Sequence, residues 1–204
     1  MAKLLLLATA ASALVAPAPL KVSAPLSAAG FDGTGASNPL GFWDPAGLSQ
    51  LGSERTQAWF KAAELKHSRV AMLATCGWIT TELGLRWPFA YDFAGDKFAD
   101  VPGGLSAEVV FRDNSGMVQI LFSLGLLEFW GELQKPHYMS GGKIGAHPVW
   151  DPVGGIKDLP EETLAYKRQS ELNNGRLAMI GAASFWSATF LDGSVPALTG
   201  YYHN

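Results

Sequence analysis

The sequence predicts an all-α membrane protein with three transmembrane helices, in which the first and third are related by an internal repeat and the middle helix lies alongside. Three observations lead to this prediction. The chain of 204 residues is 48% hydrophobic and 16% charged, a composition between those of soluble and polytopic membrane proteins. One motif recurs at a constant offset, and three helix-length stretches are separated by loops rich in Gly and Pro. We expect the repeated helices to cross about a pseudo-two-fold axis.

The first thirty residues have the character of a targeting segment rather than of a folded domain. Lys3 precedes an apolar run over residues 4–14, which is too short to span a bilayer. The following stretch contains Pro, Lys and Ser, and no acidic residue occurs before Asp32. We therefore expect residues 1–30 to be a bipartite targeting presequence and residues 31–204 to form one three-helix domain.

An internal repeat organises the rest of the chain. WDPAG at residues 43–47 recurs 107 positions later as WDPVG at residues 150–154. The same offset maps ELKHSRVAM, residues 64–72, onto ELNNGRLAM, residues 171–179. Chance matches would not keep one register from a turn motif into a helix, so we interpret the chain as two copies of one supersecondary unit.

Each copy consists of a Gly/Pro loop followed by a long helical stretch. The first helix is expected over about residues 53–84, and a middle helix over about residues 114–131, where an apolar run lies between Gly- and Pro-rich flanks. The last helix is expected to begin near Asp158, where an N-cap, an early Pro and the returning carboxylate of Glu161 follow one another. It should end before Asp192, which precedes a Gly.

Charged residues interrupt the first and last helices, so hydropathy alone would not identify either as a membrane span. Glu64 and Arg69 are about 140° apart around the helix axis and do not face each other. At mid-bilayer depth each unpaired charge costs about 3 kcal/mol. The repeat provides a solution, because Glu64 can reach Arg176 while Glu171 reaches Arg69, in two crossed ion pairs. Small residues near the crossing allow close approach: Ala62, Ala63, Ala71, Ala74, Gly175, Ala178 and Gly181.

Each copy also presents two metal-ligating side chains toward the outside of the helix pair. A guanidinium does not exhaust a carboxylate's acceptor sites, so Glu64 and Glu171 each retain an oxygen lone pair. His67 and Asn174 follow three residues later on nearly the same face. Outward donors in lipid indicate a large apolar ligand that carries its own metal. Chlorophyll fits this description, because its magnesium accepts one axial oxygen or nitrogen ligand and its macrocycle is apolar enough to lie in the hydrocarbon of a bilayer.

Other classes of protein fit the sequence less well. A di-metal carboxylate bundle enzyme also uses Glu-x-x-His, but it needs a second His where the sequence has Asn174, and it leaves Arg69 and Arg176 unexplained. With a formal net charge of -3 the chain has no basic stripe for nucleic acid. No Ser-His-Asp set, phosphate loop or zinc-ligand spacing stands out, so we do not expect an enzyme.

The two helix motifs, residues 64–72 and 171–179, resemble the first and third transmembrane helices of the chlorophyll-binding light-harvesting complex superfamily. The segment KFADVPGGLSAE, residues 97–108, is most like the red-lineage branch that binds fucoxanthin and chlorophylls a and c. ASALVAP, residues 11–17, resembles the cleavage region of bipartite presequences in algae with secondary red plastids. The resemblance extends over most of residues 40–200. It implies a multi-pass antenna protein of the plastid thylakoid membrane that transfers excitation energy to a photosystem.

Residue by residue, the resemblance implies axial chlorophyll ligation by Glu64, His67, Glu171 and Asn174, with Arg69 and Arg176 as ion-pair partners. On the middle helix, Glu128 matches a family ligand and Gln119 is a further candidate. The repeated loops imply carotenoid contacts at Trp43, Asp44, Trp150 and Asp151. The implied cofactors are chlorophyll a, chlorophyll c and xanthophylls of the fucoxanthin type. The implied partners are a photosystem core, neighbouring antenna subunits and thylakoid lipids. A photoprotective quencher on the same scaffold remains an alternative.

Overall fold

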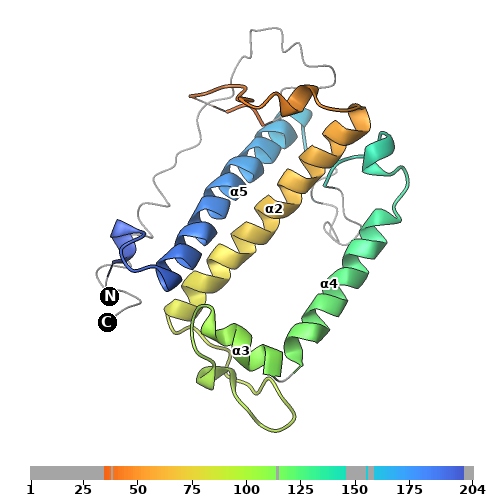
Figure 1. The fold of residues 1–204 in the computed structure, drawn as a ribbon. Helices are drawn as coiled ribbons and strands as arrows, with labels where there is room; N and C mark the ends of the chain where they lie inside the picture. Colours follow the sequence, from red (N-terminus) through yellow and green to blue (C-terminus); the bar gives the residue numbers. More distant parts are fainter. Residues whose placement is uncertain (1–34, 38, 114, 146–154, 156–158, 200–204) are drawn as a thin grey trace.

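The computed structural model describes residues 35–37, 39–113, 115–145, 155 and 159–199. Within these ranges the chain is helical and has no β-strand. Its α-helices are α2 (Glu54–Glu82), α3 (Ser106–Asp113), α4 (Gly116–Glu132) and α5 (Glu161–Phe190), and its short 3-10 turns are η1 (Leu48–Gln50), η2 (Phe98–Asp100), η3 (Tyr138–Ser140) and η4 (Pro196–Leu198). In Figure 1, α2 and α5 lie side by side and run in the same direction. α4 runs the opposite way on the far side of α2, and α3 lies at the turn between them.

The three long helices occupy the stretches predicted for them, with one shifted start. α2 follows Ser53 at the N-cap, whose backbone N–H donates to the Thr56 hydroxyl at 3.4 Å. α5 begins only at Glu161, because Pro160 occupies the N-cap with an extended ψ of 144°. The expected start near Asp158 is therefore too early, and Asp158 itself lies outside the described residues. A proline also disfavours helical geometry in the residue before it, so the helix cannot include Leu159.

The short helix α3 was not predicted, so the described chain has four helices rather than three. α3 contains only eight residues and carries no long apolar run. It is separated from α4 by Ser115, whose φ of 60° is left-handed and turns the chain into a new direction. The expected middle helix therefore exists as α4, with a short helix packed against its start.

The centre of the α2–α5 interface is occupied by residues that the repeat makes equivalent. Ser68 is fully buried, and a Cβ built on Gly175 would collide with the Ser68 side chain. Further along, Trp78 stacks on Phe185 with 5.7 Å between ring centroids. Both pairs are separated by the repeat offset, and self-equivalent contacts are what a two-fold relation produces. Only one side chain fits on the axis at the closest approach, so one copy has Ser and the other Gly.

The prediction of a small-residue interface is correct for some positions and wrong for one. Ala62, Gly175 and Ala178 are buried between the helices, but Ala74 is exposed. Ala74 faces outward because the helical repeat turns it away from the side that carries Ser68 and Thr75. The Thr75 hydroxyl donates to the Ala178 carbonyl at 3.2 Å.

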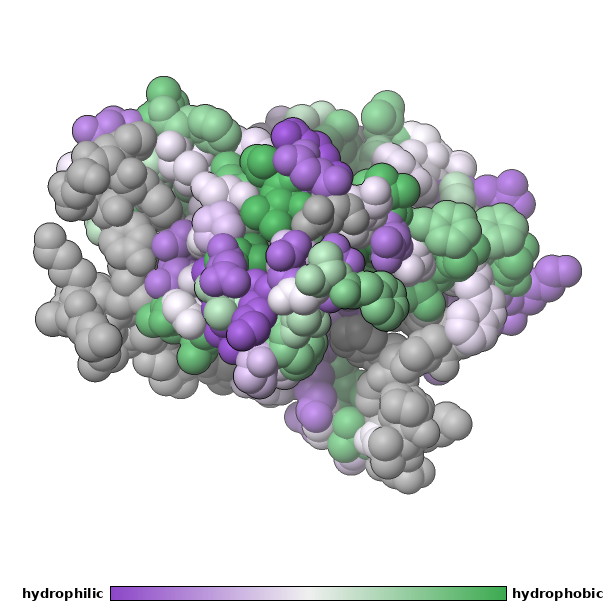
Figure 2. Space-filling view, turned by 90° about the horizontal axis from the view of Figure 1, so that it is seen from below, coloured by the Kyte–Doolittle hydropathy of each residue, from purple (hydrophilic) through white to green (hydrophobic). Residues whose placement is uncertain are grey.

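Large apolar side chains are abundant on the surface of the described chain. α4 has no buried residue, and its exposed apolar side chains are Val118, Ile120, Leu121, Phe122, Leu124, Leu126, Leu127, Phe129 and Trp130. On the face seen in Figure 2, hydrophobic residues lie at the surface beside hydrophilic ones. Over the described ranges, none of the helices combines the length and the apolar character that crossing a membrane requires.

Candidate functional site

Two ion pairs join α2 to α5, and both are the crossed pairs expected from the repeat. Arg176 donates from Nε to Oε1 of Glu64 at 2.8 Å, and Arg69 donates from Nε to Oε1 of Glu171 at 2.7 Å. The four side chains are between 25% and 36% exposed. The charges thus lie partly buried at the helix interface, where each guanidinium neutralises a carboxylate of the other helix.

Each arginine also binds a loop, a contact that the sequence does not indicate. Arg176 Nη1 donates to the Gly35 carbonyl at 2.7 Å, and Arg69 Nη1 donates to the Gly145 carbonyl at 3.0 Å. Both glycines have a left-handed backbone, with φ of 92° and 76°, and a Cβ on either would crowd the guanidinium it binds. A Gly-Ala dipeptide precedes each Trp-Asp-Pro loop, but its spacing differs between copies, so the constant offset did not reveal it.

Each paired carboxylate keeps one oxygen for another ligand. The arginines bond to Oε1 of Glu64 and of Glu171, while Oε2 of either residue accepts no hydrogen bond from the described part of the chain. A carboxylate has about four lone-pair sites, so the ion pair leaves acceptor capacity. Both glutamates are therefore neutralised donors.

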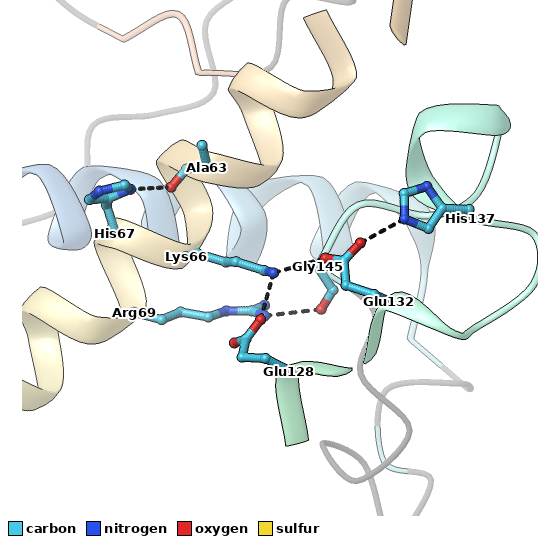
Figure 3. Close-up of polar contacts among 8 residues, drawn as sticks. All are labelled: Ala63, Lys66, His67, Arg69, Glu128, Glu132, His137 and Gly145. Atoms are coloured by element: carbon cyan, nitrogen blue, oxygen red, sulfur yellow. Dashed lines mark hydrogen bonds and ion pairs between the residues drawn. The ribbon is translucent and has the colours of Figure 1, made fainter. Parts of the chain in front are cut away.

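The His67 side chain is exposed on α2, and its orientation is determined by its own helix (Figure 3). Nδ1 lies 2.7 Å from the Ala63 carbonyl oxygen. Because a carbonyl can only accept, Nδ1 carries the proton of the neutral ring, and Nε2 is left with its lone pair. Nε2 makes no hydrogen bond to the described residues, so it is available to bind a metal from outside.

Asn174, the equivalent residue of the second copy, also has one polar atom bonded within its own helix and the other without a hydrogen bond to the described residues. Its Nδ2 donates to the Ser170 hydroxyl at 3.3 Å, which leaves the carbonyl oxygen Oδ1 pointing away from that contact. Ser170 occupies the position in the second copy that Ala63 occupies in the first, four residues before the donor. Oδ1 is the kind of hard oxygen ligand that magnesium prefers.

The middle helix contributes a carboxylate that is held by a lysine of α2. Lys66 Nζ lies 2.6 Å from Glu128 Oε2 and 3.1 Å from Glu132 Oε1 (Figure 3). Glu132 Oε2 is in turn 2.7 Å from Nε2 of His137. The repeat could not predict this network, because Lys66 corresponds to Asn173 in the second copy. The only indication of this network in the sequence is that the two predicted ion pairs leave Lys66 without a partner.

The remaining candidate residues are placed only in part. Gln119 is exposed on α4, about 180° around the helix from Glu128, so the two cannot serve one ligand. Trp43 is 69% exposed. Asp44 accepts the backbone N–H groups of Leu48 and Ser49 at 2.9 and 2.8 Å, which caps η1. The expected sites Trp150 and Asp151 lie outside the described residues.

These donors suit a metal ion that is already chelated by a cofactor and needs one further ligand from the protein. In the described ranges no three His, Cys, Asp or Glu residues are grouped to hold a bare metal ion. Instead His67 Nε2, Asn174 Oδ1 and one oxygen of each of Glu64 and Glu171 each offer a single donor atom. A single donor is what one axial position of a chelated magnesium needs, so the side chains present fit chlorophyll.

A repeat-related helix pair with crossed ion pairs and single outward donors is an arrangement that fits a helical pigment-binding protein. The sequence profile of the family described as "Chlorophyll A-B binding protein" matches residues 29–190. The chain therefore belongs to the chlorophyll A-B binding protein family, whose members serve as light-harvesting antennas, and the resemblance inferred from the helix motifs is confirmed.

Individual relatives give the same result. Fucoxanthin-chlorophyll a-c binding protein C, chloroplastic, from Phaeodactylum tricornutum is 35% identical over 160 residues, which is 76% of each chain. Protein F of the same name and organism is 36% identical over 148 residues, covering 72% of this chain and 73% of the relative. The fucoxanthin-chlorophyll a-c binding protein of Trieres chinensis is 33% identical over 200 residues, 94% of each chain.

Proposed function

We propose that the protein is an antenna subunit of the plastid thylakoid membrane that binds chlorophyll a, chlorophyll c and a xanthophyll of the fucoxanthin type, and passes excitation energy to a photosystem. The relatives named above are chloroplastic fucoxanthin-chlorophyll a-c binding proteins, which supports the pigment set and the organelle. A photosystem core and neighbouring antenna subunits are the partners that receive the energy.

The arrangement of donors on the helix pair carries this proposal. Glu64 and Glu171 are neutralised from the opposite helix, and each keeps one carboxylate oxygen for a magnesium ligand. His67 and Asn174 each use one polar atom within their own helix and present the other outward. Chlorophyll supplies light absorption and excitation transfer. The protein's part is to hold each ring at a fixed place, because transfer between pigments depends on their separation and orientation.

The lengths of the helices, the pairing of their charges and the apolar surface support the membrane location that we propose. α2 and α5 contain 29 and 30 residues, which at about 1.5 Å per residue exceeds the roughly 30 Å hydrocarbon thickness. The charges at their centres are paired, which removes most of the cost of placing them in lipid. The exposed apolar side chains of α4 suit contact with lipid tails and pigments. We therefore treat α2, α4 and α5 as the spans of a multi-pass protein.

One experiment on the purified protein tests the proposal. Its pigments are separated by chromatography, and the fluorescence excitation spectrum of chlorophyll a is recorded. We expect chlorophyll c and a fucoxanthin-type xanthophyll beside chlorophyll a, with excitation of either producing chlorophyll a emission. A protein without bound pigment, or pigments that do not sensitise chlorophyll a, would contradict it. A strongly shortened chlorophyll a lifetime in the isolated protein would favour the photoprotective quencher instead.

A further inference from the structure

α4 is joined to α2 by charge rather than by a packed apolar core. None of its residues is buried in the described chain. Lys66 on α2 instead reaches two carboxylates one turn apart on α4, Glu128 at 2.6 Å and Glu132 at 3.1 Å (Figure 3). Glu132 has a second partner in His137, at the start of the segment that returns toward α2. Glu128 has Lys66 as its only partner among the described residues.

The contact repeats the chemistry of the helix pair at a third place. Glu64 and Glu171 are each neutralised by a cation from a neighbouring helix and keep one oxygen unused. Glu128 has the same arrangement, because Lys66 bonds Oε2 and leaves Oε1 without a hydrogen bond in the described chain. Three glutamates on three helices thus share one pattern, although only two of them belong to the sequence repeat.

We propose that Lys66 is a positioning residue that makes Glu128 a pigment ligand, which rests on the proposed function. Without a cation beside it, a carboxylate in an apolar surrounding is an uncompensated charge, which is costly to place there. With Lys66 bound to Oε2, the carboxylate and its partner together carry no net charge, and Oε1 can be presented to magnesium. Lys66 also fixes the rotation of the group, because it holds the other oxygen.

A purely mechanical role makes a different prediction. If Lys66 only joins α4 to α2, every variant that breaks the contact should be equally harmful, and removing both charges should bring no recovery. If Lys66 serves to neutralise a ligand, an amide at position 128 should not need it. A glutamine there has a carbonyl oxygen that binds magnesium and no charge to compensate.

The test compares full-length variants refolded with chlorophyll a, chlorophyll c and fucoxanthin, with chlorophyll per protein and the visible circular dichroism as readouts. Lys66→Met is expected to lose about one chlorophyll per protein, the share of one axial site. Lys66→Arg and the double variant Lys66→Met with Glu128→Gln are expected to retain it. Far-ultraviolet circular dichroism verifies that each variant is folded. Arg168→Met is the matched control, because it breaks an exposed ion pair with Glu161 on α5.

The outcomes separate the inference from the function on which it rests. Full chlorophyll content in Lys66→Met, or failure of the double variant to recover the pigment, overturns the role of Lys66. Glu128→Leu then decides the ligand itself, because retention of all chlorophyll in that variant removes Glu128 from the ligand set. Failure of the unmodified protein to bind any chlorophyll would overturn the proposed function instead.

Discussion

At the scale of single residues, His67 and Asn174 each have one polar atom bonded within their own helix, which suits the outward metal-donor role that we propose for them. Each side chain uses one polar atom to bond the residue four positions earlier, Ala63 or Ser170. That bond restricts the rotamer and leaves the other polar atom facing outward. At this position the two copies of the repeat therefore present different donor atoms, an imidazole nitrogen in the first and an amide oxygen in the second.

This difference makes His67 a precise test of ligation. We expect His67→Asn to retain its pigment with altered red-edge absorption, because the shorter amide offers a harder oxygen and shifts the ring position. We expect His67→Leu to lose about one chlorophyll per protein, since it removes the donor. Pigment chromatography against protein concentration measures the ratio.

The ion pairs provide the internal control for that experiment. Arg176 and Glu64 do not involve His67, so the helix pair should remain assembled in both variants, with unchanged far-ultraviolet circular dichroism. An unchanged chlorophyll-to-protein ratio in His67→Leu would argue against ligation, unless an ordered water replaced the ring nitrogen. A structure of that variant would distinguish the two.

At the scale of helices and loops, each arginine joins three segments. Arg176 on α5 binds Glu64 on α2 and the carbonyl of Gly35 in the loop before η1. Arg69 makes the matching contacts with Glu171 and Gly145. The loops that precede both repeated helices are thus attached to the same guanidinium groups that neutralise the glutamates. Charge neutralisation and loop placement are therefore coupled.

Removing one of these arginines should be costly. Arg176→Leu would leave Glu64 as an unpaired, partly buried carboxylate and would release the Gly35 carbonyl, a loss of about 3 to 5 kcal/mol in lipid. Glu128→Gln should cost less, because an oxygen ligand remains there. The yield of pigmented protein on refolding and its denaturation midpoint measure the difference.

The same helix supplies a matched control. Arg168 forms an ion pair with Glu161 in which both side chains are largely exposed, so Arg168→Leu should change stability by at most about 1 kcal/mol. Arg69→Leu should resemble Arg176→Leu, because the repeat places it in the equivalent pair. Comparable refolding yields for Arg176→Leu and Arg168→Leu would contradict the importance of the crossed pairs.

At the scale of the whole molecule, the protein has little apolar core of its own. Its buried hydrophobic residues in the described ranges are Ala62, Val101, Leu172, Ala178, Phe185 and Ala188. Most of its large apolar side chains are exposed, and α4 buries none of its own. Apolar surface of this extent on a monomer usually marks a binding surface. In the proposed function, pigments and lipids occupy it and form part of the fold.

Pigment removal should therefore destabilise the protein as a whole. We expect the apoprotein in lipid to have lower helicity and a lower melting temperature than the pigmented form, because the outward donors and the surface of α4 lose their partners. Circular dichroism and thermal melting of the protein refolded with and without pigments measure this. If both preparations reach the same helicity and melting temperature, pigments are not structural components.

Some of this architecture could be predicted from the sequence because of the repeat. A constant offset that runs from a turn into a helix implies equivalent environments, and from this followed the positions of α2 and α5 and the partners of Glu64 and Glu171. The apolar run between Gly- and Pro-rich flanks also indicated α4. The self-equivalent contacts of Ser68 with Gly175 and of Trp78 with Phe185 obey the same offset. They were not foreseen, because polar and aromatic residues give no clear signal of lying on an axis.

Other features depended on the path of the chain. The carbonyls of Gly35 and Gly145 bind arginines that lie far from them in the sequence, and their unequal spacing from the Trp-Asp-Pro motifs hid their equivalence. The pairing of Lys66 with Glu128 required the placement of α4, which lies outside the repeat. Periodicity determines which face of a helix is apolar and which residues share it. The partner of an unrepeated charge is decided by how the loops position one helix against another, and only the tertiary structure contains that information.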